Sequence, residues 1–97
     1  MKQVIFDFKI LVDRDAFYHD FASQFQLDDK FGDNLDALWD ALVGEIELPV
    51  SIVFKHLPHY SRDFQPLVEL MKEAQNELGK DVLSFHCEHK TQKSNSE

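Results

Sequence analysis

The sequence predicts an α/β domain: a three-stranded parallel sheet packed with about three to four helices, in the order β-α-α-β-α-β. Three observations support this prediction. The 97 residues are enough for one hydrophobic core but not for two. Hydrophobic residues make up 43% of the chain and include nine Phe, as is typical of a packed globular domain. Three short apolar runs alternate with helical patterns, and right-handed crossovers would place the helices on the faces of a parallel sheet.

The first half of the chain contains one predicted strand and two predicted helices. Residues 4–8 are apolar and rich in β-forming types, which indicates a short buried strand. Asp13 is a suitable N-cap for the first helix. That helix carries an aromatic stripe at intervals of four residues, formed by Phe17, Phe21 and Phe25. Turn-forming residues at 27–32 precede a second helix, which we expect Asp33 to cap and Gly44 to end with a left-handed backbone.

The second half of the chain begins with another apolar run, residues 50–54, which predicts the second strand. A connector at 57–62 leads to a long helix with Asp63 as the expected cap, Pro66 in the first turn and Gly79 at the end. The apolar face of this helix is formed by Phe64, Leu67, Leu70, Met71, Ala74 and Leu78.

The last predicted strand covers residues 82–87. Residues 88–97 are polar and contain no apolar anchor, so we expect a disordered tail. The predicted organisation is therefore a single domain at residues 1–87 followed by this tail.

The charge of the chain narrows its possible partners. Ten Lys and Arg stand against 18 Asp and Glu, giving a net charge of -8. Such a field repels phosphate backbones and anionic lipids and attracts cationic proteins, which argues against direct binding to nucleic acid or membranes. With a single cysteine, Cys87, the chain has no internal disulfide, and no run approaches the length of a membrane span. We therefore expect a cytoplasmic protein.

Most of the negative charge lies between Asp28 and Glu47. This segment contains seven acidic residues and only one basic residue, Lys30. On the predicted second helix, Asp36 and Asp40 border an apolar stripe. Asp36 gains stability near the positive end of the helix dipole, but Asp40 lies past that turn. Two like charges one turn apart cost an exposed helix about 0.2–0.5 kcal/mol, so local stability does not account for Asp40. Charge runs usually serve solubility, and a solvated acidic face is one interpretation. A docking surface for a cationic partner is the other.

A resemblance to a known family favours the second interpretation. The stretch FGDNLDALWDAL at residues 31–42 resembles the signature of the barstar family, and the likeness continues into Gly44 and residues 47–49. The segment Lys72-Glu73-Ala74 resembles the last long helix of that family. The resemblance implies a barstar-like fold and a protein, not an enzyme, that inhibits a basic ribonuclease of the barnase type. It implies no cofactor and no metal, and we expect a monomer.

The resemblance also implies a set of partner-binding residues. Asp40 matches the aspartate that enters the phosphate-binding site of the nuclease, where its carboxylate stands in for a substrate phosphate. The complete implied set is Phe31, Asn34, Leu35, Asp36, Trp39, Asp40, Val43, Gly44, Glu47 and Glu73. Trp39 lies at the edge of the apolar stripe, so it fits either the core or the contact surface. Three residues depart from the family pattern, namely Lys30, Val43 and Glu45.

Two other classes of function remain open from the residues alone. Asp33, Asp36 and Asp40 could form a carboxylate cluster for a metal-dependent hydrolase, although a complete set of catalytic groups is not visible. The run 86–89 contains zinc-ligand types but lacks the spacing of a four-ligand site. An acidic module that binds another basic protein, without inhibiting a nuclease, uses the same helix and is the main alternative.

Overall fold

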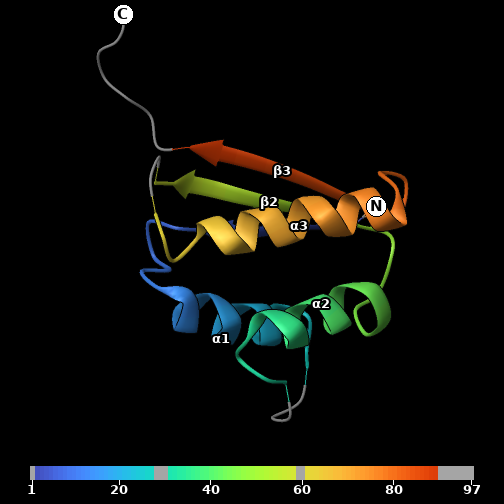
Figure 1. The fold of residues 1–97 in the computed structure, drawn as a ribbon, viewed down its shortest axis with the longest axis horizontal. Coiled ribbons are helices and arrows are strands. Elements are labelled where there is room, and N and C mark those ends of the chain that lie inside the picture. The colour runs from blue at the N-terminus through green and yellow to red at the C-terminus, as the bar shows by residue number, and fades with distance from the viewer. Residues whose placement is uncertain (1, 28–30, 59–60, 90–97) are drawn as a thin grey trace, which may run out of the picture.

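The computed structural model describes residues 2–27, 31–58 and 61–89 and confirms the predicted α/β fold (Figure 1). Its strands are β1 (Lys2–Asp7), β2 (Val50–Leu57) and β3 (Leu83–His89). Its helices are α1 (Arg14–Gln24), α2 (Leu35–Gly44) and α3 (Gln65–Leu78). The strands form one parallel sheet in the order β1-β2-β3. No helix in the described ranges is both long enough and apolar enough to cross a membrane.

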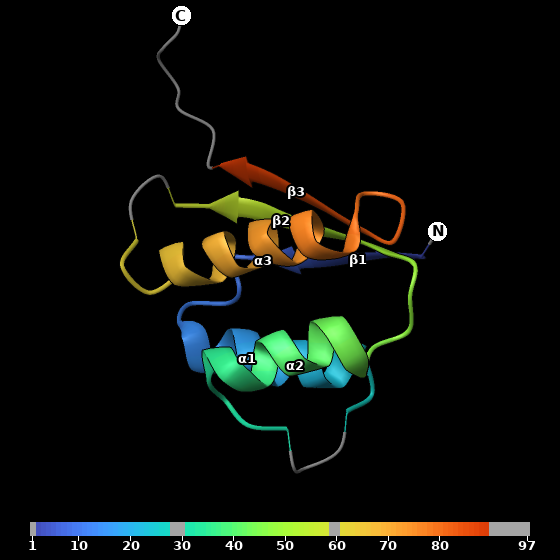
Figure 2. The same ribbon diagram turned by 45° about the vertical axis from the view of Figure 1, so that its right-hand side comes forward.

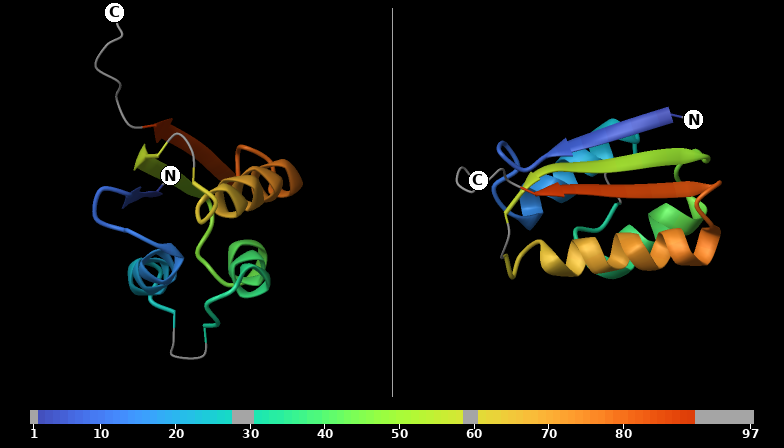
Figure 3. Two further views of the ribbon diagram at one scale, coloured as in Figure 1. Left: turned by 60° about the vertical axis from the view of Figure 1, so that its left-hand side comes forward. Right: turned by 90° about the horizontal axis from the view of Figure 1, so that it is seen from above.

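All three helices lie on one face of the sheet, which is more specific than the prediction of helices on its faces (Figure 3). The strand order explains this arrangement. A sheet that grows in one direction through right-handed crossovers has every connecting helix on one face. α1 and α2 lie side by side, and α3 runs along the sheet and packs against α2 (Figures 2 and 3).

The alternation of buried and exposed residues agrees with this one-sided packing. Along β1, Val4 and Phe6 are buried against the helices, while Ile5 between them lies on the open face and is 40% exposed. The same face of β3 carries His86 and Glu88, both exposed. One face of the sheet therefore packs against the helices and the other carries none. On that other face Val53 of the central strand is only 5% exposed, although Ile5 and His86 beside it are exposed.

A bulge in β2 adjusts this alternation near the carboxyl end of the sheet. The register between β2 and β3 shifts between Phe54 and Leu57, and His56 has a left-handed backbone with φ of 58°. Phe54 and Leu57 are both buried, while Lys55 and His56 between them are only half-buried. The extra residue thus allows Leu57 to reach the core, as expected for a bulge.

The core is dominated by aromatic rings. Phe17 of α1 is fully buried, and its ring centroid lies 4.9 Å from that of Phe6, 5.6 Å from Phe54 and 5.9 Å from Phe21. These tilted and edge-to-face pairs are the arrangements that aromatic quadrupoles favour. The predicted aromatic stripe of the first helix is confirmed as core at Phe17 and Phe21, with Phe25 half-buried beside them.

The caps of the first two helices differ in how well they were predicted. Asp13 caps α1, because its Oδ1 accepts a hydrogen bond from the Ala16 N–H at 2.8 Å. The prediction of Asp33 as the cap of α2 is wrong. Asn34 fills that position, and its Oδ1 accepts the Ala37 N–H at 2.8 Å. Both residue types cap well, so a shift of one residue decided the outcome.

The ends of the helices bring two further corrections. Asp63 does not cap α3. The N-cap is Phe64, whose N–H donates to the Ser61 hydroxyl at 3.2 Å. Gly44 has no left-handed backbone, because α2 continues through it and its C-cap is Glu45, with φ of -122°. Gly79 is confirmed as the end of α3, with φ of 92°.

The last strand is longer than predicted. β3 continues to His89 and so includes two residues, Glu88 and His89, that were predicted to belong to the tail. The rest of the predicted tail, residues 90–97, lies outside the described residues.

Candidate functional site

Helix α2 is held in place by one apolar face and by its cap. Leu38, Ala41 and Leu42 are fully buried in the core. The Asn34 side chain fixes the first turn through its hydrogen bond to the Ala37 N–H. The opposite face of the helix therefore stands at the surface in a fixed orientation.

Asp36 and Asp40 lie on this outer face and are both exposed. Neither carboxylate forms a hydrogen bond or an ion pair with any other residue in the described ranges. The last turn of α2 contains no basic residue that would offset the negative end of the helix dipole. Both carboxylates are thus free to accept hydrogen bonds from an outside partner.

Four of the other predicted site residues surround these carboxylates on α2 or at its cap. Leu35, Trp39 and Val43 are half-buried, and Asn34 is exposed. Trp39 packs against the hydrophobic core with part of its ring and leaves the rest at the surface. Trp39 is therefore a core residue with an exposed edge, and its role as a contact residue stays a prediction.

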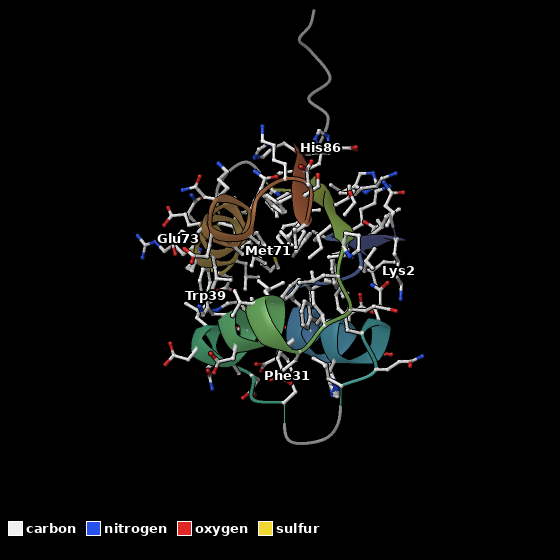
Figure 4. All side chains as sticks on the ribbon, turned by 90° about the vertical axis from the view of Figure 1, so that its right-hand side faces the viewer. Lys2, Phe31, Trp39, Met71, Glu73 and His86 are labelled. Atoms are coloured by element: carbon white, nitrogen blue, oxygen red, sulfur yellow. The ribbon has the colours of Figure 1, made fainter. Side chains whose placement is uncertain are left out.

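Glu73 comes from a different helix but lies on the same side of the molecule. Figure 4 shows Glu73 of α3 and Trp39 of α2 on one side, with Met71 directed to the interior. Glu73 is exposed, and α2 and α3 pack directly against each other. The fold therefore brings a third carboxylate toward the surface formed by α2.

Three predicted site residues lie at the borders of this surface. Phe31 is half-buried, and its ring stacks on Phe21 with a centroid distance of 5.5 Å, so it contributes to packing as well as to the surface. Gly44, the last residue of α2, and Glu47 beyond the end of the helix are both exposed. A Cβ at Gly44 would meet no heavy atom within 4 Å, so sterics do not require glycine there.

A groove beside α2 was not predicted. It has a volume of about 370 Å³ and lies between the start of α1 and the start of α2. The residues that define it include Arg14, Asp15 and Tyr18 of α1 and Asp33, Leu35 and Asp36 around the start of α2. These two groups lie far apart in the sequence, so no local pattern indicated the groove. Asp36 belongs both to the groove and to the acidic face of α2.

The geometry gives no support to the metal sites considered from the sequence. Among the described residues, no three His, Cys, Asp or Glu side chains gather closely enough to hold a metal ion. In the run 86–89, strand alternation separates neighbouring side chains. His86 and Glu88 share the open face, where the His86 Nε2 lies 3.7 Å from a Glu88 carboxylate oxygen.

Burial raises the pKa of the Cys87 thiol, while the nearby Lys72 ammonium acts in the opposite direction. The thiol is therefore mostly protonated at neutral pH, which is the form of low nucleophilicity. Lys30, one of the departures from the family pattern, lies outside the described residues, as do the nearby Asp28 and Asp29.

Comparison with known proteins assigns the chain to a family. The family model described as "Barstar (barnase inhibitor)" matches residues 1–90. The chain is 32% identical over 83 residues to a Bacillus subtilis (strain 168) protein named "Putative ribonuclease inhibitor YrdF". That match covers 80% of this chain and 90% of the relative. With a family match over nearly all of its length, this chain belongs to the barstar family.

Proposed function

We propose that this protein inhibits a basic ribonuclease of the barnase type by placing the outer face of α2 in the active site of the enzyme. The observation that carries this proposal is the pair of exposed carboxylates on α2, Asp36 and Asp40, which have no partner among the described residues. Membership of the barstar family and the name of the relative point to the same class of function.

The chemistry of such a site fits a carboxylate. A ribonuclease binds the phosphates of RNA through cationic side chains, and an Asp oxygen held at the same place accepts charge-assisted hydrogen bonds from them. Asp40 stands in the middle of α2, where the buried residues of the same helix fix its direction. The inhibitor therefore meets the enzyme with little loss of conformational entropy, which favours tight binding.

The surroundings of Asp40 supply the rest of the interface. Trp39 and Val43 offer apolar area next to the carboxylates, and Glu73 adds a further negative charge from α3. A hot spot at the centre of an interface requires such neighbours, because they exclude water from the ion pairs. On this proposal the protein is an inhibitor and not an enzyme, and it acts inside the producing cell before the ribonuclease is exported.

The direct test is inhibition of RNA cleavage. Purified chain is added at increasing molar ratio to a panel of basic ribonucleases of the barnase type, including the one encoded by the producing cell. We expect cleavage by at least one enzyme to stop near a ratio of one to one. The Asp36→Ala/Asp40→Ala double variant should restore cleavage, while Asp81→Ala, which removes a carboxylate from the turn between α3 and β3, should not.

A failure to inhibit any enzyme of the panel would contradict the proposal. A parallel pull-down from the producing cells, using the wild type and the double variant, then identifies the partner that depends on the two aspartates. A basic protein without nuclease activity among those partners would favour the alternative of a general acidic binding module.

A further inference from the structure

The parallel sheet has two edges that no other strand of the described residues covers. β1 and β3 each pair with β2 and with no further strand in those ranges. An edge strand presents unpaired backbone N–H and C=O groups, which can pair with a strand of another molecule. Ile5 increases this tendency, because it is an apolar residue of β1 whose side chain is 40% exposed on the open face. The two edges are therefore the surfaces through which strands of two copies of this chain could pair.

At the β3 edge, two successive outward N–H groups are already bonded within the chain. The Val82 carbonyl accepts a hydrogen bond from an N–H of β2 at 3.0 Å, so this residue faces β2. Backbone groups of alternate residues point to opposite sides of a strand, so those of Leu83 and Phe85 do not both face β2 with it but point outward. The Leu83 N–H donates to the Gly79 carbonyl at 2.9 Å. The Phe85 N–H donates to Oε1 of Gln75 on α3 at 2.8 Å.

At the β1 edge, two successive outward carbonyls are bonded in the same manner. The Phe8 N–H donates to a carbonyl of β2 at 2.9 Å, so alternation directs the backbone groups of Asp7 and Ile5 outward. The Asp7 carbonyl accepts two N–H groups of the following turn, both at 3.0 Å. The Ile5 carbonyl accepts a hydrogen bond from Nε2 of Gln24 on α1 at 3.0 Å. The same Nε2 atom donates to Oδ2 of Asp20 at 2.8 Å, which holds the Gln24 side chain in place.

We propose that Gln24 and Gln75 keep the chain monomeric by closing the two edges of the sheet against strand addition by a second copy. Each edge is closed by one glutamine from a neighbouring helix and by one turn of the backbone. α1 contacts β1, and α3 lies along β3 (Figure 3). An incoming strand would have to break these hydrogen bonds before its own backbone could pair, so it would gain little at those groups. This role is independent of the proposed function, because neither glutamine belongs to α2.

The glutamine side chain suits both edges, because its amide carries a donor and an acceptor without a charge. At β3 the edge group is an N–H, and Oε1 of Gln75 takes the place that a carbonyl of a neighbouring strand would take. At β1 the edge group is a carbonyl, and Gln24 uses its Nε2 atom instead. A glutamate could therefore replace Gln75 but not Gln24, where its carboxylate would face the Ile5 carbonyl and the Asp20 carboxylate.

The first measurement is the mass of the full chain by sedimentation velocity over a range of protein concentrations. Salt at about 0.5 M screens the repulsion between two chains of net charge -8. The wild type should remain a monomer. Gln24→Ala and Gln75→Ala should each dimerise as the concentration rises, with a self-association constant at least about tenfold above that of the wild type.

Two further variants serve as controls for this measurement. Gln75→Glu should remain a monomer, because a carboxylate oxygen can still accept the Phe85 N–H. Gln65→Ala should also remain a monomer. Gln65 is the matched control, because it lies on the same helix as Gln75 and its side chain donates to Glu69 at 3.1 Å, not to a strand.

Amide hydrogen exchange of the same proteins shows whether a dimer uses the opened edge. In monomeric Gln75→Ala, the Phe85 N–H should exchange about tenfold faster than in the wild type, because it has lost its acceptor. At high protein concentration its exchange should slow again, as a strand of the second copy supplies a carbonyl. In Gln24→Ala, dimerisation should likewise slow the exchange of the Ile5 N–H, which points to the opened edge.

Three results would overturn the proposal. The first is a monomer for both alanine variants at every concentration. The second is a dimer in which the Phe85 or Ile5 N–H exchanges as fast as in the monomer of the same variant, since such a dimer uses another surface. The third is dimerisation of Gln65→Ala or Gln75→Glu to the same extent as Gln75→Ala. If Gln75→Ala does not fold, Gln24→Ala alone decides the outcome through the same two measurements.

Discussion

The Nδ1 atom of His56 lies 2.9 Å from Oδ1 of Asp7, a contact that joins the carboxyl ends of β2 and β1 on the open face of the sheet. The same Asp7 oxygen accepts a hydrogen bond from the Lys9 N–H at 2.9 Å. His56 has a left-handed backbone, with φ of 58°, and its side chain is partly exposed, as is that of Asp7. The Lys9 N–H contributes most to lowering the pKa of Asp7, followed by the hydrogen bond from His56.

The first prediction concerns acid stability. Because the folded-state pKa of Asp7 lies below its ordinary value of 3.8, the ionised carboxylate stabilises the fold at pH values above 3.8. That contribution is lost as the pH falls through the lower folded-state value. Asp7→Asn should therefore be less stable than the wild type at pH 5–7, and the difference should shrink at more acidic pH. Urea denaturation across this range tests the prediction, and a constant difference would contradict it.

His56→Ala provides an internal comparison for this prediction. It removes the hydrogen bond that lowers the pKa of Asp7 less, and it leaves the hydrogen bond from the Lys9 N–H in place. The variant should therefore keep part of the pH dependence that Asp7→Asn loses. Identical pH profiles for the two variants would mean that His56 carries the whole effect.

A second prediction concerns the aromatic core. Phe17 is fully buried among Phe6, Phe21 and Phe54. Phe17→Ala should lower the free energy of unfolding by about 3–5 kcal/mol, because it removes a large ring and leaves a cavity. The control is Ile10→Ala, since Ile10 is 72% exposed and its truncation should change stability by less than about 0.5 kcal/mol. Equal losses for the two variants, measured in urea, would contradict the structure of the core.

The sequence predicted the position of every strand and helix because each one combines a clear hydrophobic period with a turn or cap signal. It failed where the outcome depends on a single residue or on distant parts of the chain. Asp33 and Asn34 are equally suitable caps, and the register of α2 chooses between them. The bulge at His56 has no local signal, because it arises from the need to bury both Phe54 and Leu57.

In the candidate site, too, the features within one helix were predictable and those that join distant parts of the chain were not. The acidic face of α2 was visible in the sequence because its residues belong to one helix with a fixed period. The groove was not visible, because it depends on Asp15 and Tyr18 of one helix meeting Asp33 and Asp36 at the start of another. Similarly, the placement of all helices on one side of the sheet follows from strand order, which no local pattern reports.

A third prediction tests the corrected cap. Asn34→Ala should lower the free energy of unfolding by about 1 kcal/mol, because the Ala37 N–H would lose its side-chain acceptor. Asp33→Ala, one residue earlier, should change it by less than about 0.5 kcal/mol, since Asp33 makes no capping bond. Chemical denaturation of both variants decides the matter. A larger loss of unfolding free energy for Asp33→Ala than for Asn34→Ala would mean that Asp33 is the N-cap, as the sequence predicted.

A fourth prediction separates stability from binding at Asp40. Asp40→Ala removes a like charge one turn from Asp36 and introduces a better helix former, so the free protein should become more stable by about 0.5–1 kcal/mol. Binding to the ribonuclease should weaken by at least about 2 kcal/mol, a magnitude taken from the family's archetypal complex and not from this structure. Denaturation and calorimetry on the same variant measure the two effects. Unchanged affinity would remove Asp40 from the interface.

The last prediction concerns the rate of encounter. With a net charge of -8 and exposed carboxylates on α2, the protein should be steered toward a basic enzyme. The association rate should therefore fall at least about tenfold between low salt and about 0.5 M salt, while the dissociation rate changes less. Stopped-flow measurements across salt concentrations test this, and the Asp36→Ala/Asp40→Ala variant should show a shallower slope. A flat salt dependence of the wild type would instead indicate that apolar contacts, with Trp39 as their centre, govern the encounter.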